Sequence, residues 1–224
     1  VIDNPKTEVV IDDARHYLLT TDKKFDAITS DPFDPWVKGA ATLYTTEFWL
    51  EVREHLNPGG VVTVFVQLYE STLDAVKSEV ATFLEVFPHG MVFANLNQGQ
   101  GYDVVMLAQQ EPTVIDLDVI DNKLSTPEYV TVAQSLSEVG FYSAAQLMST
   151  FAAKKPEIDP WLADAEITRD RNLRLQFLAG LGVNRYEADA IYRDMAQYRT
   201  YPEKLFVGSP QNLARLRAAW SRME

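Results

Sequence analysis

The sequence predicts an α/β protein that ends in an all-helical region. Between residues 1 and 112, short β-branched or apolar runs alternate with segments whose apolar residues recur at helical spacing. From about Glu111 onwards, helical spacing dominates. We therefore predict an α/β domain over residues 1–112 and a helical domain over residues 113–224.

Several strands are expected in the first domain. They lie at residues 7–11, 25–30, 61–66, 91–96 and 103–108. Residues 25–30 are expected to be a buried strand, and the β-branched run at 61–66 predicts a parallel strand covered on both faces. Residues 91–96 are expected at a sheet edge, followed by a hairpin turn at Gly99-Gln100-Gly101.

Helices are expected between these strands. One begins near His16, Thr45 or Thr46 caps the next, and Ser71 begins another. The apolar faces of the latter two are formed by Phe48, Val52, Leu56, Val76, Val80, Phe83, Leu84 and Phe87. This order of elements, closed by a hairpin, matches the second part of a class I methyltransferase-like (Rossmann-like) sheet.

The second domain is expected to hold only helices. Thr126-Pro127 and Ser209-Pro210 each supply a cap and a proline in the first turn, and Ser143 begins another helix. A further helix covers about residues 185–198. Residues 173–177, LRLQF, are expected to be an extended linker, and Val130 and Val139 are expected to face inward.

The composition limits the classes of ligand. The 224 residues include 32 acidic and 20 basic side chains, a net charge of −12, which disfavours nucleic acid and anionic membrane surfaces and favours cationic ligands. The absence of cysteine excludes disulfides and thiolate chemistry, and the histidine spacing indicates no metal site. No run approaches 18 apolar residues, so the chain as given is expected to be soluble.

Two carboxylates follow the expected strand at residues 25–30. Asp31 and Asp34 alternate with Pro32 and Pro35, whose rings restrict the backbone, so both acids lie on a stiff loop. A carboxylate pair at the carboxyl end of a parallel strand suits the capture of a cationic amine. The alternative is that both acids cap the turn by accepting backbone N–H groups.

The pattern at Asp31–Pro35 has the form D-x-x-D-P, and Leu43-Tyr44-Thr45, Glu47-Phe48 and a Leu56–Gly60 turn follow it. These residues resemble the spermidine synthase (polyamine aminopropyltransferase) family. The longer run DPFDPWVKGAATLYTTEFW is similar to synthase-like domains fused to a membrane-transporter-like segment.

The resemblance implies a reaction and a set of roles. An aminopropyl group would pass from decarboxylated S-adenosylmethionine to a polyamine such as putrescine, without a metal. Asp31 and Asp34 would be catalytic and substrate-binding, Gln67 would bind substrate, and Asp13 and Ala14 would bind the nucleoside cofactor. Asp13 has an alternative reading as a helix cap.

The Gly-rich loop of such a sheet is missing from the sequence. We therefore expect that an N-terminal segment or a second polypeptide completes the sheet, that the protein is an oligomer, and that it is cytoplasmic with an association to a membrane protein. Two alternatives stay open: methyl transfer from ordinary S-adenosylmethionine, and a non-catalytic structural or interaction subunit.

Overall fold

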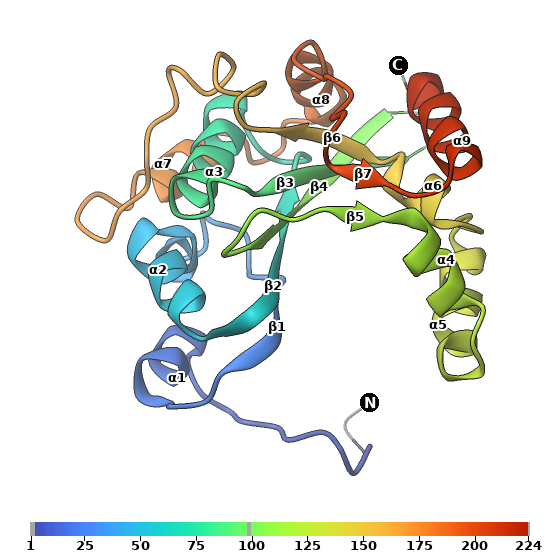
Figure 1. Cartoon of the computed structure of the whole chain (residues 1–224). Coiled ribbons are helices and arrows are strands. Elements are labelled where there is room, and N and C mark those ends of the chain that lie inside the picture. The colour runs from blue at the N-terminus through green and yellow to red at the C-terminus, as the bar shows by residue number, and fades with distance from the viewer. Residues whose placement is uncertain (1–2, 98–99, 224) are drawn as a thin grey trace.

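The computed structural model describes residues 3–97 and 100–223, and its centre is a five-stranded mixed sheet in the order β1-β2-β4-β3-β6 (Figure 1). β1 pairs in parallel with β2, and the other neighbours are antiparallel. The strands are β1 (Phe25–Ser30), β2 (Leu56–Gln67), β3 (Met91–Asn97), β4 (Gln100–Gln109) and β6 (Phe151–Lys154). A small parallel sheet joins β5 (Ile115–Asp116) to β7 (Phe206–Val207). The predicted α/β class is confirmed.

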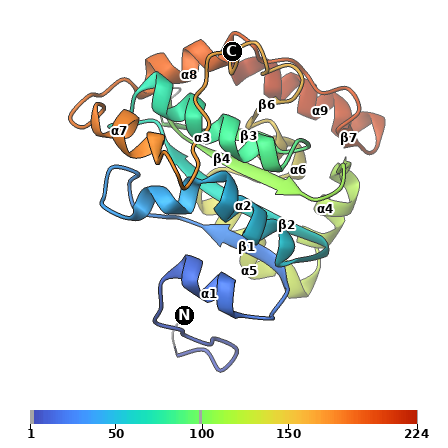
Figure 2. The same cartoon turned by 90° about the vertical axis from the view of Figure 1, so that its left-hand side faces the viewer.

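One side of the sheet carries α1 (Ala14–Thr20), α2 (Thr46–Glu54), α3 (Leu73–Val86) and α7 (Arg174–Gly180), as Figures 1 and 2 show. The core there joins alternate residues of β2, Val62, Val64 and Val66, to the apolar face of α3. Thr45 caps α2 by accepting the Phe48 N–H, and the Thr72 hydroxyl accepts the Ala75 N–H at the start of α3. The caps fix where both helices begin after their loops.

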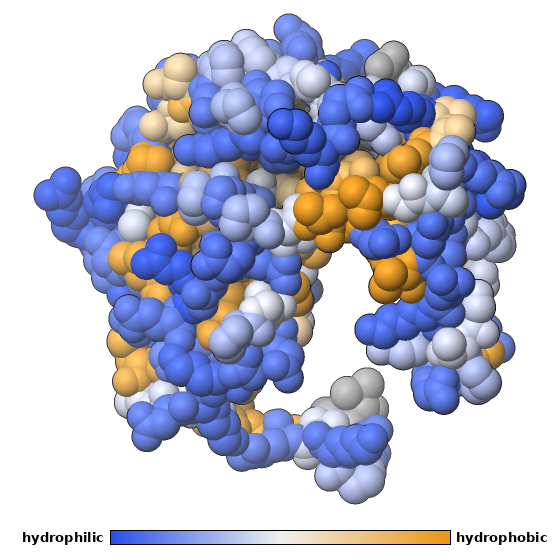
Figure 3. Space-filling view, viewed as in Figure 1, coloured by the Kyte–Doolittle hydropathy of each residue, from blue (hydrophilic) through white to orange (hydrophobic). Residues whose placement is uncertain are grey.

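A second hydrophobic core lies around the β6 end of the sheet. It is built from Met91, Phe151, Phe206 and Trp220, together with residues of α6 (Ala144–Met148) and α9 (Pro210–Trp220). α4 (Leu117–Leu124) and α5 (Val130–Glu138) extend from this core, and the surface is hollowed between them and β1 (Figure 3). α8 (Ala188–Ala196) packs on β4. Short 3-10 turns cover Ala40–Tyr44 (η1), Pro127–Tyr129 (η2) and Ser221–Met223 (η3).

Several strand predictions are wrong. Residues 7–11 form no strand, and Ile11 is 98% exposed, because no neighbouring strand takes up their backbone groups within the described chain. β1 has no buried residue, because it lies at the sheet edge. β3 is interior instead of an edge, since β6 pairs with its other side. The hairpin turn at Gly99 lies partly outside the described residues.

The C-terminal half also differs from its prediction. It is not all helical, because β6 joins the main sheet. Residues 174–177 begin α7 instead of forming a linker. Val130 and Val139 are exposed, since α5 buries none of its residues. The division at residue 112/113 stays a prediction.

Two smaller corrections concern the first half. Leu56 belongs to β2 and not to the preceding helix, which ends at Glu54. The cap of α3 is Thr72 instead of Ser71. Within residues 3–97 and 100–223, none of the helices has both the length and the apolar character needed to cross a membrane.

Candidate functional site

The loop after β1 carries the first two site residues. Asp31 is exposed and Asp34 is half-buried. The loop is held from beneath by Tyr44, whose hydroxyl donates to the Phe33 carbonyl at 3.1 Å, and the Val37 N–H donates to the Asp34 carbonyl at 2.9 Å. These two hydrogen bonds therefore hold the backbone of the loop in place.

Neither carboxylate serves as a cap. In the part of the chain that the structure describes, the side chains of Asp31 and Asp34 accept no hydrogen bond and form no ion pair, although nine ion pairs occur elsewhere among those residues. The turn-capping alternative is thus not what the structure contains. Two unpaired carboxylates at one loop create a negative potential that favours a cation.

Gln67 lies at the end of β2, directly opposite Asp103 of β4. Both side chains are buried, with 6% and 4% of their surface exposed. The Gln67 Nε2 atom has no hydrogen-bond partner in the described chain, whereas Asp103 Oδ2 accepts from Asn95 Nδ2 at 3.1 Å. Burial raises the pKa of Asp103, the hydrogen bond from Asn95 lowers it in part, and the charge of Asp31 raises it. Asp103 therefore belongs electrostatically to the same site as Asp31.

A fourth carboxylate, Glu79, reaches this region from α3. Its side chain is only 3% exposed, and its Oε1 atom has no hydrogen-bond partner among the described residues. Burial raises the pKa of Glu79 well above its ordinary value of 4.5, and the charge of Asp34 acts in the same direction. The pKa of Tyr44 is likewise raised, first by burial and then by Glu79, Asp34 and Asp31.

The sequence analysis did not predict Asp103 or Glu79 as site residues. Nothing in the local sequence around either residue distinguishes it from other acidic residues in strands and helices.

Aromatic rings and α7 form the surroundings of these acids. Tyr69 and Tyr102 lie with ring centroids 4.9 Å apart, and Asp34 and Asp31 both raise the pKa of Tyr69, after burial and the neighbouring Tyr102. Tyr44 packs against Leu175, Leu178 and Ala179 of α7. The segment first expected to be a linker is therefore part of the wall behind the acidic loop.

The two residues predicted to bind the cofactor lie beside β1. Asp13 caps α1, accepting the His16 N–H at 2.9 Å, which is the alternative role considered for it. Ala14 lines an apolar cavity of about 310 Å³ between α1, α2 and β1, whose lining extends to Ser30. Since Asp31 follows Ser30, this cavity reaches the start of the acidic loop. A role in cofactor binding stays a prediction for both residues.

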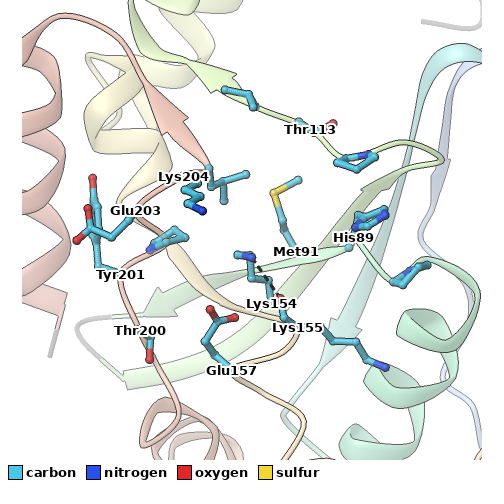
Figure 4. Close-up of a pocket in the computed structure, with 16 residues that line it drawn as sticks. His89, Met91, Thr113, Lys154, Lys155, Glu157, Thr200, Tyr201, Glu203 and Lys204 are labelled. Carbon is cyan, nitrogen blue, oxygen red and sulfur yellow. Dashed lines mark hydrogen bonds between the residues drawn. The ribbon is translucent and has the colours of Figure 1, made fainter.

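A larger cavity of about 530 Å³ lies elsewhere, between the start of β3, the end of β6 and residues 200–205. Figure 4 shows Lys154, Glu157 and Lys204 projecting into it. None of the predicted site residues lines this cavity. No group of three or more potential metal ligands occurs in residues 3–97 and 100–223.

The fold and the site define an α/β protein with a mixed sheet and an acidic cluster at the end of its parallel strand pair. Residues 1–97 match the model of the spermine/spermidine synthase domain.

Individual relatives cover only part of the chain. A polyamine aminopropyltransferase of Aeropyrum pernix is 33% identical over 130 residues, which are 55% of this chain and 41% of that protein. Polyamine aminopropyltransferase 2 of Hyperthermus butylicus is 48% identical over 58 residues, 25% of this chain and 19% of that protein. The chain thus spans less than half the length of these relatives. A probable spermidine synthase from Corynebacterium glutamicum aligns in structure with a TM-score of 0.47 and 22% identity, covering 72% of this chain and 53% of its own.

Proposed function

We propose that this chain carries the amine-binding side of a polyamine aminopropyltransferase site, in which a polyamine such as putrescine accepts an aminopropyl group from decarboxylated S-adenosylmethionine. The main support is that the carboxylates of Asp31 and Asp34 lack counter-ions within the described residues and act electrostatically on Asp103 and Glu79. A cationic ligand would neutralise this excess of negative charge. The match of residues 1–97 to the spermine/spermidine synthase domain supports the choice of an amine as this cationic ligand.

In the proposed reaction, the amine nitrogen attacks the propyl carbon next to the sulfonium. A C–N bond forms, the C–S bond breaks, methylthioadenosine leaves with the bonding electrons, and the amine loses a proton. The sulfonium is already activated, so the residues mainly position the amine. One carboxylate holds an ammonium by about 4 kcal/mol at ~4 Å if the effective dielectric constant is about 20.

Direct proton transfer to Asp31 is a poor route. An ordinary Asp carboxyl, with a pKa of about 3.9, and an amine, with a pKa of about 10, differ by about six units, or roughly 8 kcal/mol. We therefore assign Asp31 the role of orienting the amine while its proton leaves through water. Asp34 is the second anchor, and Gln67 contributes a buried donor without a partner within the described residues.

The remaining part of the cofactor site is proposed to come from outside these residues. Asp13 and Ala14 would contact the nucleoside, and a segment with a Gly-rich loop would pair with the free edge of β1. This segment belongs either to the same, longer polypeptide or to a second chain. Native mass spectrometry of the protein from its source, with the denatured mass of each chain, distinguishes these two cases.

Asp31→Asn tests the proposal in the complete protein. With decarboxylated S-adenosylmethionine and putrescine, we expect release of methylthioadenosine and a loss of about 10²-fold in kcat/KM for the variant, because the amine is no longer aligned. Asp22→Asn changes an exposed acid before β1 and serves as the matched control. Absence of any spermidine from the wild-type protein would contradict the proposal and favour methyl transfer or a non-catalytic role.

A further inference from the structure

The cavity of about 530 Å³ has walls that come from four separate segments of the chain. The segments are the turn between α3 and β3, the residues after β4, the end of β6 with the residues that follow it, and the residues before β7. Met91 of β3 lies directly opposite Lys154 of β6, and the Ile115 N–H donates to the Leu205 carbonyl at 2.8 Å. The pairing of both sheets thus holds the walls together. A cavity of this volume is typical of sites for small molecules.

Two of the charged side chains that line the cavity already have ionic partners. The Lys155 Nζ atom lies 3.6 Å from Asp159 Oδ1, and the Glu203 carboxylate pairs with Arg217. Neighbouring side chains therefore neutralise these two charges, and neither is left to attract a ligand.

Three other charged side chains, Lys154, Glu157 and Lys204, form no ion pair within residues 3–97 and 100–223. Figure 4 shows all three projecting into the cavity. Lys154 Nζ donates to the Lys155 carbonyl at 3.2 Å, whereas the Glu157 Oε2 atom is buried and accepts no hydrogen bond from the described chain. A buried oxygen without a donor costs free energy. Two ammonium groups and one carboxylate are thus available to a ligand.

The rest of the lining is largely apolar. It includes Met91, Val114, Leu205 and the prolines at positions 88, 112 and 202. The ring of Tyr201 also lines the cavity, and it is fixed by Arg217 at 4.2 Å from its centre and by the Trp220 ring at 5.5 Å. Apolar walls around three charged groups suit a small organic molecule better than a bare inorganic ion.

We propose that this cavity binds a small organic zwitterion, an amino acid or a phosphorylated amine. Its carboxylate or phosphate group pairs with Lys154 and Lys204, and its ammonium group pairs with Glu157. An ammonium group is the favoured donor to Glu157, because a hydrogen bond between two charged groups is stronger than one from a neutral hydroxyl. Lysine carries a point charge and does not select between carboxylate and phosphate by geometry. None of the residues assigned to the amine site lines this cavity, so the inference is independent of the proposed function.

Isothermal titration calorimetry of the full chain with two matched pairs of probes tests this assignment. L-Aspartate and succinate differ in a single ammonium group, and so do phosphoethanolamine and ethyl phosphate. In at least one pair, we expect the probe with the ammonium group to bind about tenfold more tightly, a difference of about 1.4 kcal/mol. The pair that binds identifies the anionic group. Binding of neither pair, or equal affinities within each pair, would overturn the proposal.

Variants separate the roles of the charged residues. Lys204→Gln should weaken both members of the bound pair about tenfold, whereas Glu157→Gln should weaken only the member with the ammonium group. Lys6→Gln removes the same charge from an exposed lysine in the N-terminal segment and is the matched control. Equal effects of Lys204→Gln and Lys6→Gln, or equal losses for both probes in Glu157→Gln, would contradict the assigned contacts. Circular dichroism of each variant checks that the fold is retained.

Discussion

At the scale of single residues, the site is defined by charges that lack counter-ions. Asp31 and Asp34 have no cationic partner within the described residues, and Asp103 and Glu79 are buried close enough to respond to them. Burying a carboxylate costs free energy unless it is paired or protonated. The arrangement is therefore less stable when empty than it would be with a cation bound.

Glu79 makes folding stability depend on pH. Its pKa is raised in the folded protein, so above about pH 4.5 the folded state retains a proton that the unfolded chain has lost. The free energy of unfolding contributed by this group is greatest below that pH and falls as pH rises through the folded pKa. Glu79→Gln cannot lose this proton, so the variant should gain stability relative to wild type as pH increases.

Urea unfolding of both proteins at about pH 5 and about pH 8 measures this difference. Glu85→Gln controls for the loss of an acid from α3. A difference between wild type and Glu79→Gln that stays constant with pH would contradict the raised pKa.

At the scale of elements, the position of α7 against the site depends on close backbone contact. The Thr72 hydroxyl donates to the Leu178 carbonyl at 3.2 Å, and the Glu70 N–H donates to the Arg185 carbonyl at 3.1 Å. Gly182 lies directly against Ser71, so that a Cβ atom there would be 2.4 Å from the Ser71 carbonyl carbon. The segment after α7 thereby holds the loop between β2 and α3.

Gly182→Ala should disturb this contact without altering a charged group. Because the added methyl meets backbone, we expect a loss of about 1–3 kcal/mol in the free energy of unfolding and a lower Tm. Gly180→Ala is the control, since its Cβ would lie 3.9 Å from Trp36 Cβ, an ordinary contact. Thermal unfolding of both variants measures the effect. Equal Tm values for the two variants would contradict the close contact between Gly182 and the Ser71 backbone.

At the scale of the whole molecule, the two sides of the five-stranded sheet differ: other elements cover the side of β3 and β6, whereas β1 lies at an exposed edge. β6 and the second hydrophobic core cover the β3 side, and Arg15 of α1 pairs with Asp170 from the C-terminal half. Among residues 3–97 and 100–223, β1 pairs only with β2, and every residue of β1 is at least partly exposed. A strand edge with free N–H and C=O groups is a site at which a further strand can pair.

Hydrogen exchange should reveal this difference. In the chain of residues 1–224, we expect amides of β1 to exchange faster than amides of β4, because β4 is paired on both sides. A further strand of the kind proposed above should slow the exchange of β1 when it pairs with that strand. Equal β1 exchange rates in this chain and in the assembly isolated from its source would argue against such a pairing.

The sequence alone was sufficient to predict the α/β class, the helix caps at Ser143 and Ser209, and the carboxylate pair Asp31 and Asp34. It left the cap of α2 open between Thr45 and Thr46, and the structure contains Thr45. These features depend on local rules. The rules are the spacing of apolar residues along the chain, the residue types that cap helices, and the prolines that restrict the backbone of a loop. The resemblance of residues 1–97 to the spermine/spermidine synthase domain was recognisable for the same reason, since its motif is contiguous.

Only the tertiary structure decided what surrounds that motif. It brought Glu79 and Asp103 to the acidic loop, converted residues 174–177 into part of α7, and placed β6 beside β3. These outcomes depend on contacts between residues distant in sequence, for which a single chain's local pattern holds no signal. A buried acid and a surface acid have the same side chain, and the folded environment alone gives them different chemistry.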